Sequence, residues 1–283
     1  MTEPKRVAVL GRGLVPVHEP VLRADDLGAL HGDGLFETLH VRRGRPWLAD
    51  EHLTRLARAA AGAELPLPPV GALAGLLDTI CAGWPPEVEG ALRLVCTRGP
   101  EGGGPSTVYA TLGEVPAAAR RARETGVSVA TLPLGVTADG RAGLGWLPTG
   151  GKSISYASST AARRWAARRG VDDVLWVSTD GYALEGPTAS LVWLEGGTLC
   201  TVPPARTGVL PGVTAAWLLA HAAELGCAAA ERMTTPGDLR QADVAWLTSS
   251  LRGVAEIRTL DGVGLGRQVS PHTRRLQALL GQP

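Results

Sequence analysis

Short apolar runs separated by turns make up the first part of the chain. The predicted strands are Val7–Leu10, Phe36–Val41, Ala91–Thr97 and Thr107–Leu112. Asp50 is predicted to cap a helix in which Leu53 and Leu56 form an apolar stripe, and a second helix is predicted over 70–84. Together these elements predict a small α+β domain over residues 1–116.

More strands and helices follow a polar stretch, residues 117–124, which is interpreted as a linker because it is rich in alanine and arginine. The predicted strands are Val127–Leu132, Asp173–Ser178, Ser190–Leu194, Thr198–Val202, Val244–Ser249 and Val254–Leu260. Helices are predicted at Ala157–Arg169 and Gly212–Leu225, and Ser270 is expected to cap a last one. The pattern predicts a two-domain α/β (α+β) fold in which residues 125–283 form the larger C-terminal domain.

Composition and charge narrow the class of protein. A hydrophobic content of 45% in 283 residues allows a sizeable core, while a net charge of +1 gives no basic field for nucleic acid. No segment approaches the roughly 20 apolar residues that span a bilayer, and Val7–Leu10 is too short for the core of a signal peptide. The four cysteines lack a metal-type spacing and are interpreted as thiols, so we expect a cytoplasmic protein.

Lysine is unusually scarce in this chain. Of 28 basic residues only Lys5 and Lys152 are lysines, so arginine supplies positive charge almost everywhere. An amine that loses its proton can attack a carbonyl, which a guanidinium cannot do. Lys152 is therefore a candidate nucleophile, although an ordinary solvated lysine is the alternative.

The neighbours of Lys152 fit a large planar ligand. Gly150 and Gly151 precede the lysine and leave room beside its amine, and Tyr156 carries a phenol toward the same region. Partly apolar surroundings favour the neutral amine. Further on, Glu185 follows an Asp-Gly turn at a strand entrance, where it either pairs with a buried cation or is simply solvated.

Several groups along the chain are candidates for binding phosphate. Gly212, Val213 and Thr214 open a helix whose free amides suit an anion, although a plain capped helix has the same pattern. Hydroxyls at the end of a strand and a guanidinium in the first domain add to this set. They belong to Ser249, Ser250 and Arg55.

Two other chemistries are poorly supported. The run Val7–Gly13 imitates a dinucleotide-binding fingerprint, but Pro16 stands where its third glycine belongs. The chain has no Gly-x-Ser-x-Gly elbow, and its six histidines have no metal-ligand spacing, so a hydrolase and a metal site are disfavoured.

Taken in order, these residues resemble the class IV (fold-type IV) pyridoxal-phosphate aminotransferases and lyases over essentially the whole chain. The segment 32–38, Gly-Asp-Gly-Leu-Phe-Glu-Thr, resembles the early strand signature of the family. The resemblance implies that Lys152 carries pyridoxal 5'-phosphate, that Tyr156 contacts the cofactor's ring oxygen and that Glu185 pairs with its pyridine nitrogen. It also implies a set of phosphate-binding residues, namely Arg55, Gly212, Val213, Thr214, Ser249 and Ser250.

Within this family the chain most resembles aminodeoxychorismate lyases. The segments Thr97–Gly99 and Thr248–Arg252 are similar to theirs, while the Arg-x-His pair usual in D-amino acid aminotransferases is replaced by a glycine-rich loop, residues 101–105. The implied reaction converts 4-amino-4-deoxychorismate to 4-aminobenzoate and pyruvate, a step of folate biosynthesis. Transamination of D-amino or branched-chain amino acids is the alternative, because it uses the same lysine.

The resemblance carries further expectations about ligands and assembly. The substrate is a small molecule whose carboxylate needs an arginine, for which Arg98 and Arg252 are candidates. A homodimer is implied, with the cofactor between the two domains of each subunit. No nucleic acid, membrane or metal is expected as a partner.

Overall fold

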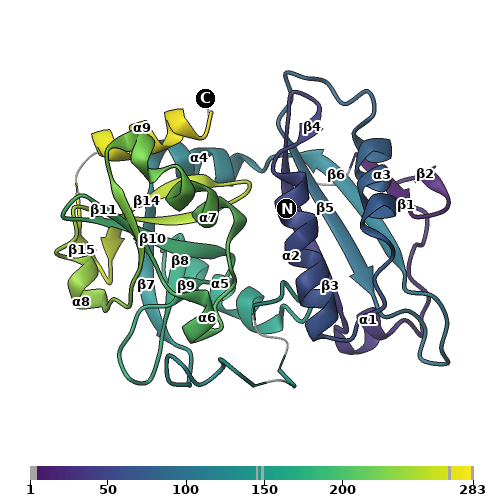
Figure 1. The fold of residues 1–283 in the computed structure, drawn as a ribbon, viewed down its shortest axis with the longest axis horizontal. Coiled ribbons are helices and arrows are strands. Elements are labelled where there is room, and N and C mark those ends of the chain that lie inside the picture. The colour runs from purple at the N-terminus through teal and green to yellow at the C-terminus, as the bar shows by residue number, and fades with distance from the viewer. Residues whose placement is uncertain (1–4, 145, 148–149, 267–268, 282–283) are drawn as a thin grey trace. The chain divides into compact units, whose positions relative to one another are not determined.

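A computed structural model describes residues 5–144, 146–147, 150–266 and 269–281 (Figure 1). The chain divides into two compact units, one containing Met1–Ala117 with Gly145–Tyr156, the other Ala118–Leu144 with Ala157–Pro283. Each unit has a hydrophobic core of its own, so each is described by itself. None of the helices in these ranges has the length and apolar character needed to cross a membrane.

The first unit is built on an antiparallel sheet of six strands in the order β2-β1-β6-β5-β3-β4. Its strands are β1 (Arg6–Val9), β2 (Gly13–Val15), β3 (Gly34–Arg42), β4 (Arg45–Pro46), β5 (Gly90–Thr97) and β6 (Val108–Glu114). Its helices are α1 (Leu27–His31), α2 (Ala49–Gly62) and α3 (Val70–Cys81). The strands predicted in this part of the chain are all present, because each alternates between core and opposite face.

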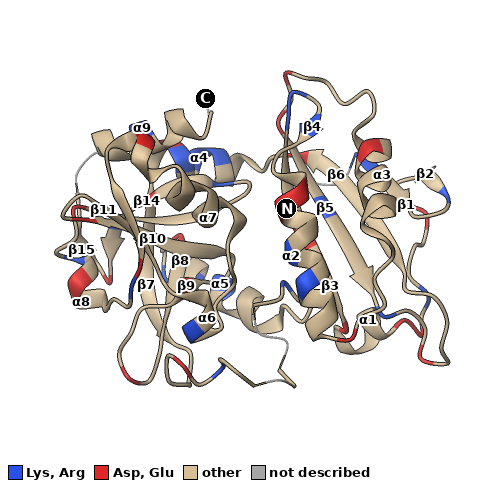
Figure 2. Ribbon diagram, viewed as in Figure 1, with Lys and Arg blue, Asp and Glu red and all other residues tan. Residues whose placement is uncertain are grey.

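Helices α2 and α3 cover one face of this sheet (Figure 1). Leu35 and Leu39 of β3 point into the core that they form with Leu53 and Leu56 of α2. The first turn of α2 is acidic, as Figure 2 shows, which suits the positive end of the helix dipole. Asp50 lies inside α2 and does not cap it: the N-cap is Leu48, and no side chain caps this end.

Residues 152–154 join the first unit through an isolated β-bridge to β3. The Phe36 N–H donates to the Lys152 carbonyl at 2.8 Å, and the Ile154 N–H donates to the Gly34 carbonyl at 3.0 Å. Leu35 and Ser153 face each other across this antiparallel bridge. A Cβ at Gly34 would lie 2.7 Å from the Cys96 carbonyl oxygen of β5 and 2.9 Å from Ile154 Cδ1, so glycine is needed where these segments meet. This pairing corrects the expected boundary, which put Lys152 in the C-terminal domain.

The second unit contains a mixed sheet in the order β12-β11-β10-β13-β14-β7-β8, with β15 on β14 and β9 on β10. Its strands are β7 (Val127–Pro133), β8 (Asp173–Val177), β9 (Glu185–Gly186), β10 (Ala189–Glu195), β11 (Thr198–Thr201), β12 (Ala228–Glu231), β13 (Val244–Ser249), β14 (Gly253–Leu260) and β15 (Val263–Gly264). Its helices are α4 (Ala117–Thr125), α5 (Ala157–Arg168), α6 (Pro204–Thr207), α7 (Val213–Ala220), α8 (Pro236–Leu239) and α9 (Pro271–Leu279), with a 3-10 turn at Ala222–Leu225.

Two segments of the second unit differ from expectation. Residues 117–124, expected as a linker, form most of helix α4, because Arg123 is buried and donates to the Leu251 carbonyl. The helix predicted over Gly212–Leu225 ends at Ala220 and continues as the 3-10 turn, which stops at Gly226 with φ 73°. Neither departure is visible in the local hydrophobic pattern.

Candidate active site

The amine of Lys152 lies among aromatic rings of the first unit. Its Nζ is 3.3 Å from the Tyr156 hydroxyl and 4.7 Å from the centroid of the Phe36 ring. The Phe36 and Tyr156 rings meet edge to face, with centroids 5.2 Å apart. Because Phe36 also donates its N–H to the Lys152 carbonyl, both the backbone and the amine of the lysine are placed by the start of β3.

Arg55 belongs to a buried cluster behind this strand. Its Nε donates to Glu37 Oε1 at 2.8 Å, and His52 Nδ1 lies 2.8 Å from Glu37 Oε2. Burial by itself would raise the pKa of Glu37, but the hydrogen bond of His52 and the charge of Arg55 outweigh it and lower that pKa to about 2. The guanidinium of Arg55 is therefore held in one orientation by a fully ionised carboxylate.

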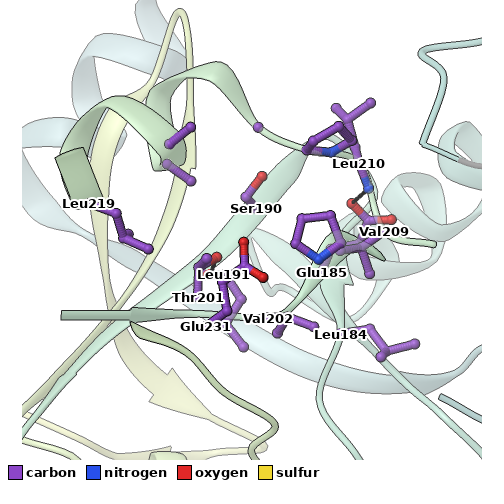
Figure 3. A pocket seen from close by; sticks show the side chains of 15 residues that line it. Leu184, Glu185, Ser190, Leu191, Thr201, Val202, Val209, Leu210, Leu219 and Glu231 are labelled. Atoms are coloured by element: carbon purple, nitrogen blue, oxygen red, sulfur yellow. Dashed lines mark hydrogen bonds between the residues drawn. The ribbon is translucent and has the colours of Figure 1, made fainter. Parts of the chain in front are cut away.

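Glu185 stands at the start of β9 in the second unit. Its Oε2 accepts the Leu210 N–H at 3.1 Å, the dashed line in Figure 3. Its Oε1 lies 3.8 Å from Nη2 of Arg141. The residue lines a cavity of about 110 Å³ beside α7, here named the α7 cavity. Further lining residues include Ser190, Leu210, Gly212, Ala215 and Glu231.

The N-terminus of α7 has the features of an anion site. Gly212 is its N-cap, and among the described residues no side-chain cap bonds to the first amides of the helix. The Thr214 hydroxyl is buried and has no hydrogen-bond partner in the part of the chain that the structure describes. A Cβ at Gly212 would lie 2.2 Å from Ser190 Oγ, so only glycine fits this cradle. A phosphate would satisfy both the amides and the hydroxyl.

Ser249 is the last residue of β13, which pairs with the strand that carries Ser190, and Ser250 follows it. The Ser249 hydroxyl accepts the Arg252 N–H at 3.3 Å, which closes a tight turn. Arg123 of α4 holds the same turn through the Leu251 carbonyl. The helix that replaces the expected linker thus positions a turn to which the family resemblance assigns phosphate contacts.

In the structure, Arg98 and Arg252, the two arginines predicted to bind a substrate carboxylate, form bonds within the protein. Arg98 donates from Nε to Asp33 at 2.6 Å and from Nη1 and Nη2 to carbonyls at the end of α2. Arg252 pairs with the buried Asp173 at 2.8 Å. Both guanidiniums are committed to bonds within their own unit, so these two candidates are not favoured.

Two charged residues near the site, Glu37 and Arg93, were not predicted from the sequence as functional residues. Glu37 shares the buried face of β3 with Leu35 and Leu39, and a carboxylate in such an apolar stripe is a readable signal that a buried cation must pair with it. Arg93 lies on the opposite face, with its guanidinium 5.0 Å from the Phe36 ring centroid. The position of Arg93 follows only from the register of β3 and β5, which no local pattern gives.

Comparison with known proteins identifies the family. The model of the class IV amino-transferases matches residues 34–260. A bifunctional aminodeoxychorismate lyase / D-amino acid transaminase of Mycobacterium tuberculosis is 41% identical over 256 residues, which are 88% of this chain and 89% of that protein. A D-alanine aminotransferase of Bacillus licheniformis is 26% identical over 90% of this chain and 89% of its own.

Solved structures agree with this. A hypothetical aminotransferase from Mycobacterium tuberculosis, in its PLP-bound form, has a TM-score of 0.92 at 38% identity and covers 98% of this chain and 97% of that one. A fold IV transaminase from Curtobacterium pusillum has a TM-score of 0.90 at 34% identity, over 97% and 96%. The chain belongs to the class IV aminotransferase family, and the predicted family and fold class are confirmed.

The Glu37 cluster makes the stability of the protein depend on pH. Because the folded pKa of Glu37 is about 2 against an ordinary value of 4.5, its contribution is complete above pH 4.5 and is lost as the pH falls toward 2. Between pH 6 and pH 3 this loss is about 2 kcal/mol of the free energy of unfolding.

Urea unfolding of the protein and of Glu37→Gln at pH 6 and pH 3 measures this loss of stability. The variant is expected to be less stable at pH 6, because Arg55 loses its partner, and to lose less on acidification. Glu87→Gln, at an exposed position, is the control and should follow the unsubstituted protein. Equal acid losses in the protein and in Glu37→Gln would contradict the assignment.

Proposed function

We propose that this protein is a pyridoxal-phosphate-dependent lyase that converts 4-amino-4-deoxychorismate to 4-aminobenzoate and pyruvate. The observation that carries the proposal is the Lys152 amine, 3.3 Å from the Tyr156 hydroxyl and enclosed by the Phe36 and Tyr156 rings. The lyase is preferred over other reactions of the family because a relative with 41% identity is a bifunctional aminodeoxychorismate lyase / D-amino acid transaminase.

The residues present suit pyridoxal 5'-phosphate. Lys152 would hold it covalently, Glu185 would face its pyridine nitrogen, and Gly212, Val213 and Thr214 would bind its phosphate. The unsatisfied Thr214 hydroxyl supports this, because a buried hydroxyl without a partner calls for a ligand. When bound, the group supplies an electron sink for the carbon that loses a proton.

The phosphate is proposed to have more partners than the α7 N-terminus. Ser249 and Ser250 lie on the turn that Arg123 holds, and their hydroxyls would donate hydrogen bonds to phosphate oxygens. Arg55 would contribute charge from the first unit, with its guanidinium oriented by Glu37.

Proton transfer is the task proposed for Lys152 itself. Its amine removes the proton from the substrate carbon that bears nitrogen, and the Tyr156 hydroxyl orients the amine. The bond from the ring to the enolpyruvyl oxygen then breaks, and the ring becomes aromatic as 4-aminobenzoate. The released enol takes up the proton at its methylene carbon and becomes pyruvate, so the reaction needs no further reactant.

Transamination of D-amino acids is the second candidate function. The bifunctional relative favours it, and the same amine would serve, with the proton returned to the cofactor and not to a leaving group. The choice between the two reactions depends on the groups that bind the substrate.

A coupled assay tests the lyase. The purified protein, loaded with pyridoxal 5'-phosphate, is given chorismate, glutamine and an aminodeoxychorismate synthase, and 4-aminobenzoate and pyruvate are measured. Both products are expected in equal amounts. If neither forms while D-alanine and 2-oxoglutarate give pyruvate, the lyase proposal is wrong and the aminotransferase stands.

Arg93 is the arginine that we propose for the substrate carboxylate. Its guanidinium and the Lys152 amine lie against the same Phe36 ring, at 5.0 and 4.7 Å from the centroid. In the described part of the chain Arg93 forms neither an ion pair nor a hydrogen bond, and burial lowers its pKa. A half-buried guanidinium with no anion beside it is ready to bind one.

Replacing Arg93 by Gln separates substrate binding from stability. Loss of a charge-assisted pair should raise KM for a carboxylate substrate about 10- to 100-fold and leave the unfolding temperature nearly unchanged. Arg98→Gln should do the opposite, because Arg98 ties Asp33 to the end of α2. Steady-state kinetics and thermal unfolding of both variants measure this, and an unchanged KM in Arg93→Gln rules Arg93 out.

A further inference from the structure

Arg141 is a charged neighbour of Glu185 that has no task in the mechanism above. Its Nη2 lies 3.8 Å from Glu185 Oε1, whereas the other oxygen of the carboxylate accepts the neutral Leu210 N–H (Figure 3). Nη2 of Arg141 is buried and has no hydrogen-bond partner within the described ranges. The guanidinium therefore acts on Glu185 through its charge.

The backbone places Arg141 beside Glu185. The Ala138 N–H donates to the Asp180 carboxylate at 2.9 Å, and the Thr179 N–H donates to the Val136 carbonyl at 2.8 Å. The segment before Arg141 is thereby tied to the turn at 178–182, which leads directly into Glu185. One turn thus determines where both charges lie, so their proximity is a property of the fold.

Two further carboxylates belong to the surroundings of Glu185. Glu231 of β12 also lines the α7 cavity, and Asp180 lies on the turn that precedes β9. The hydrogen bond from Ser178 lowers the pKa of Asp180, and the charge of Arg206 acts on Asp180 in the same direction. Against these carboxylates, Arg141 is the cation that the described residues place next to Glu185.

We propose that Arg141 is a positioning residue that keeps Glu185 ionised, so that the proton shared with the cofactor's pyridine nitrogen stays on the nitrogen. The inference rests on the proposed function, in which Glu185 faces that nitrogen. A cation within about 4–6 Å makes a carboxylate a weaker base. A proton on the pyridine nitrogen also lies farther from the positive charge of Arg141 than a proton on the Glu185 carboxyl, so the repulsion is weaker. A protonated ring is the stronger electron sink.

The first test needs no cofactor. In the apoprotein with labelled glutamate, carbon NMR follows the Glu185 carboxyl against pH, with Glu185→Gln to assign its signal. Arg141→Gln should move the titration midpoint up by about one pH unit, and Arg141→Lys, which keeps the charge, should restore most of the difference. Arg232→Gln is the matched control, because Arg232 pairs with Glu195 at 3.9 Å on the exposed surface.

The second test uses the protein loaded with pyridoxal 5'-phosphate. The absorbance of the bound cofactor is titrated with pH in the unsubstituted protein, Arg141→Gln and Glu185→Gln, and Arg141→Gln is expected to shift toward Glu185→Gln. An unmoved Glu185 midpoint in Arg141→Gln overturns the role of Arg141. If that midpoint moves but Glu185→Gln leaves the cofactor titration unchanged, the proposed placement of Glu185 at the ring nitrogen fails instead.

Discussion

Two backbone hydrogen bonds between residues 152–154 and the start of β3 fix the position of Lys152, the residue proposed to react. They run from the Phe36 N–H to the Lys152 carbonyl and from the Ile154 N–H to the Gly34 carbonyl. Because they attach the lysine to the sheet of the first unit, its amine lies against the Phe36 ring beside the Tyr156 hydroxyl. Without this pairing the amine would stand on a glycine-rich loop and would have no defined neighbours.

The arginine-rich composition has a structural counterpart. Arg55 with Glu37 and Arg252 with Asp173 are buried pairs that join elements far apart in the sequence, and the fork of the guanidinium suits it to this work. Buried pairs specify geometry more than they stabilise, since desolvation offsets much of their attraction. Lysine, which loses its proton more readily, occurs besides the N-terminal Lys5 only at Lys152, the position where we propose that an amine reacts.

Much of the fold could be predicted from the sequence, because the pattern of apolar and polar residues within each strand is a local signal. Side chains alternate between the two faces along Phe36–Val41 and Ala91–Thr97, which indicates a sheet with one face in the core. The segment 32–38 and the order of Arg55, Lys152, Glu185 and the helix start at 212–214 predicted the family. The pairing of Lys152 with β3, the helix at 117–124 and the place of Arg93 could not be predicted, because each depends on a contact between residues distant in sequence.

The central claim is that Lys152 is the residue that carries the cofactor, and the scarcity of lysine makes a direct measurement possible. The protein is loaded with pyridoxal 5'-phosphate, reduced with borohydride, digested and mapped by mass spectrometry. Lys5, which pairs with Glu114 at the surface, is the internal control, since it is the other lysine of the chain. The account predicts the reduced cofactor on the peptide that contains Lys152, and its absence there, or labelling of Lys5 instead, would contradict it.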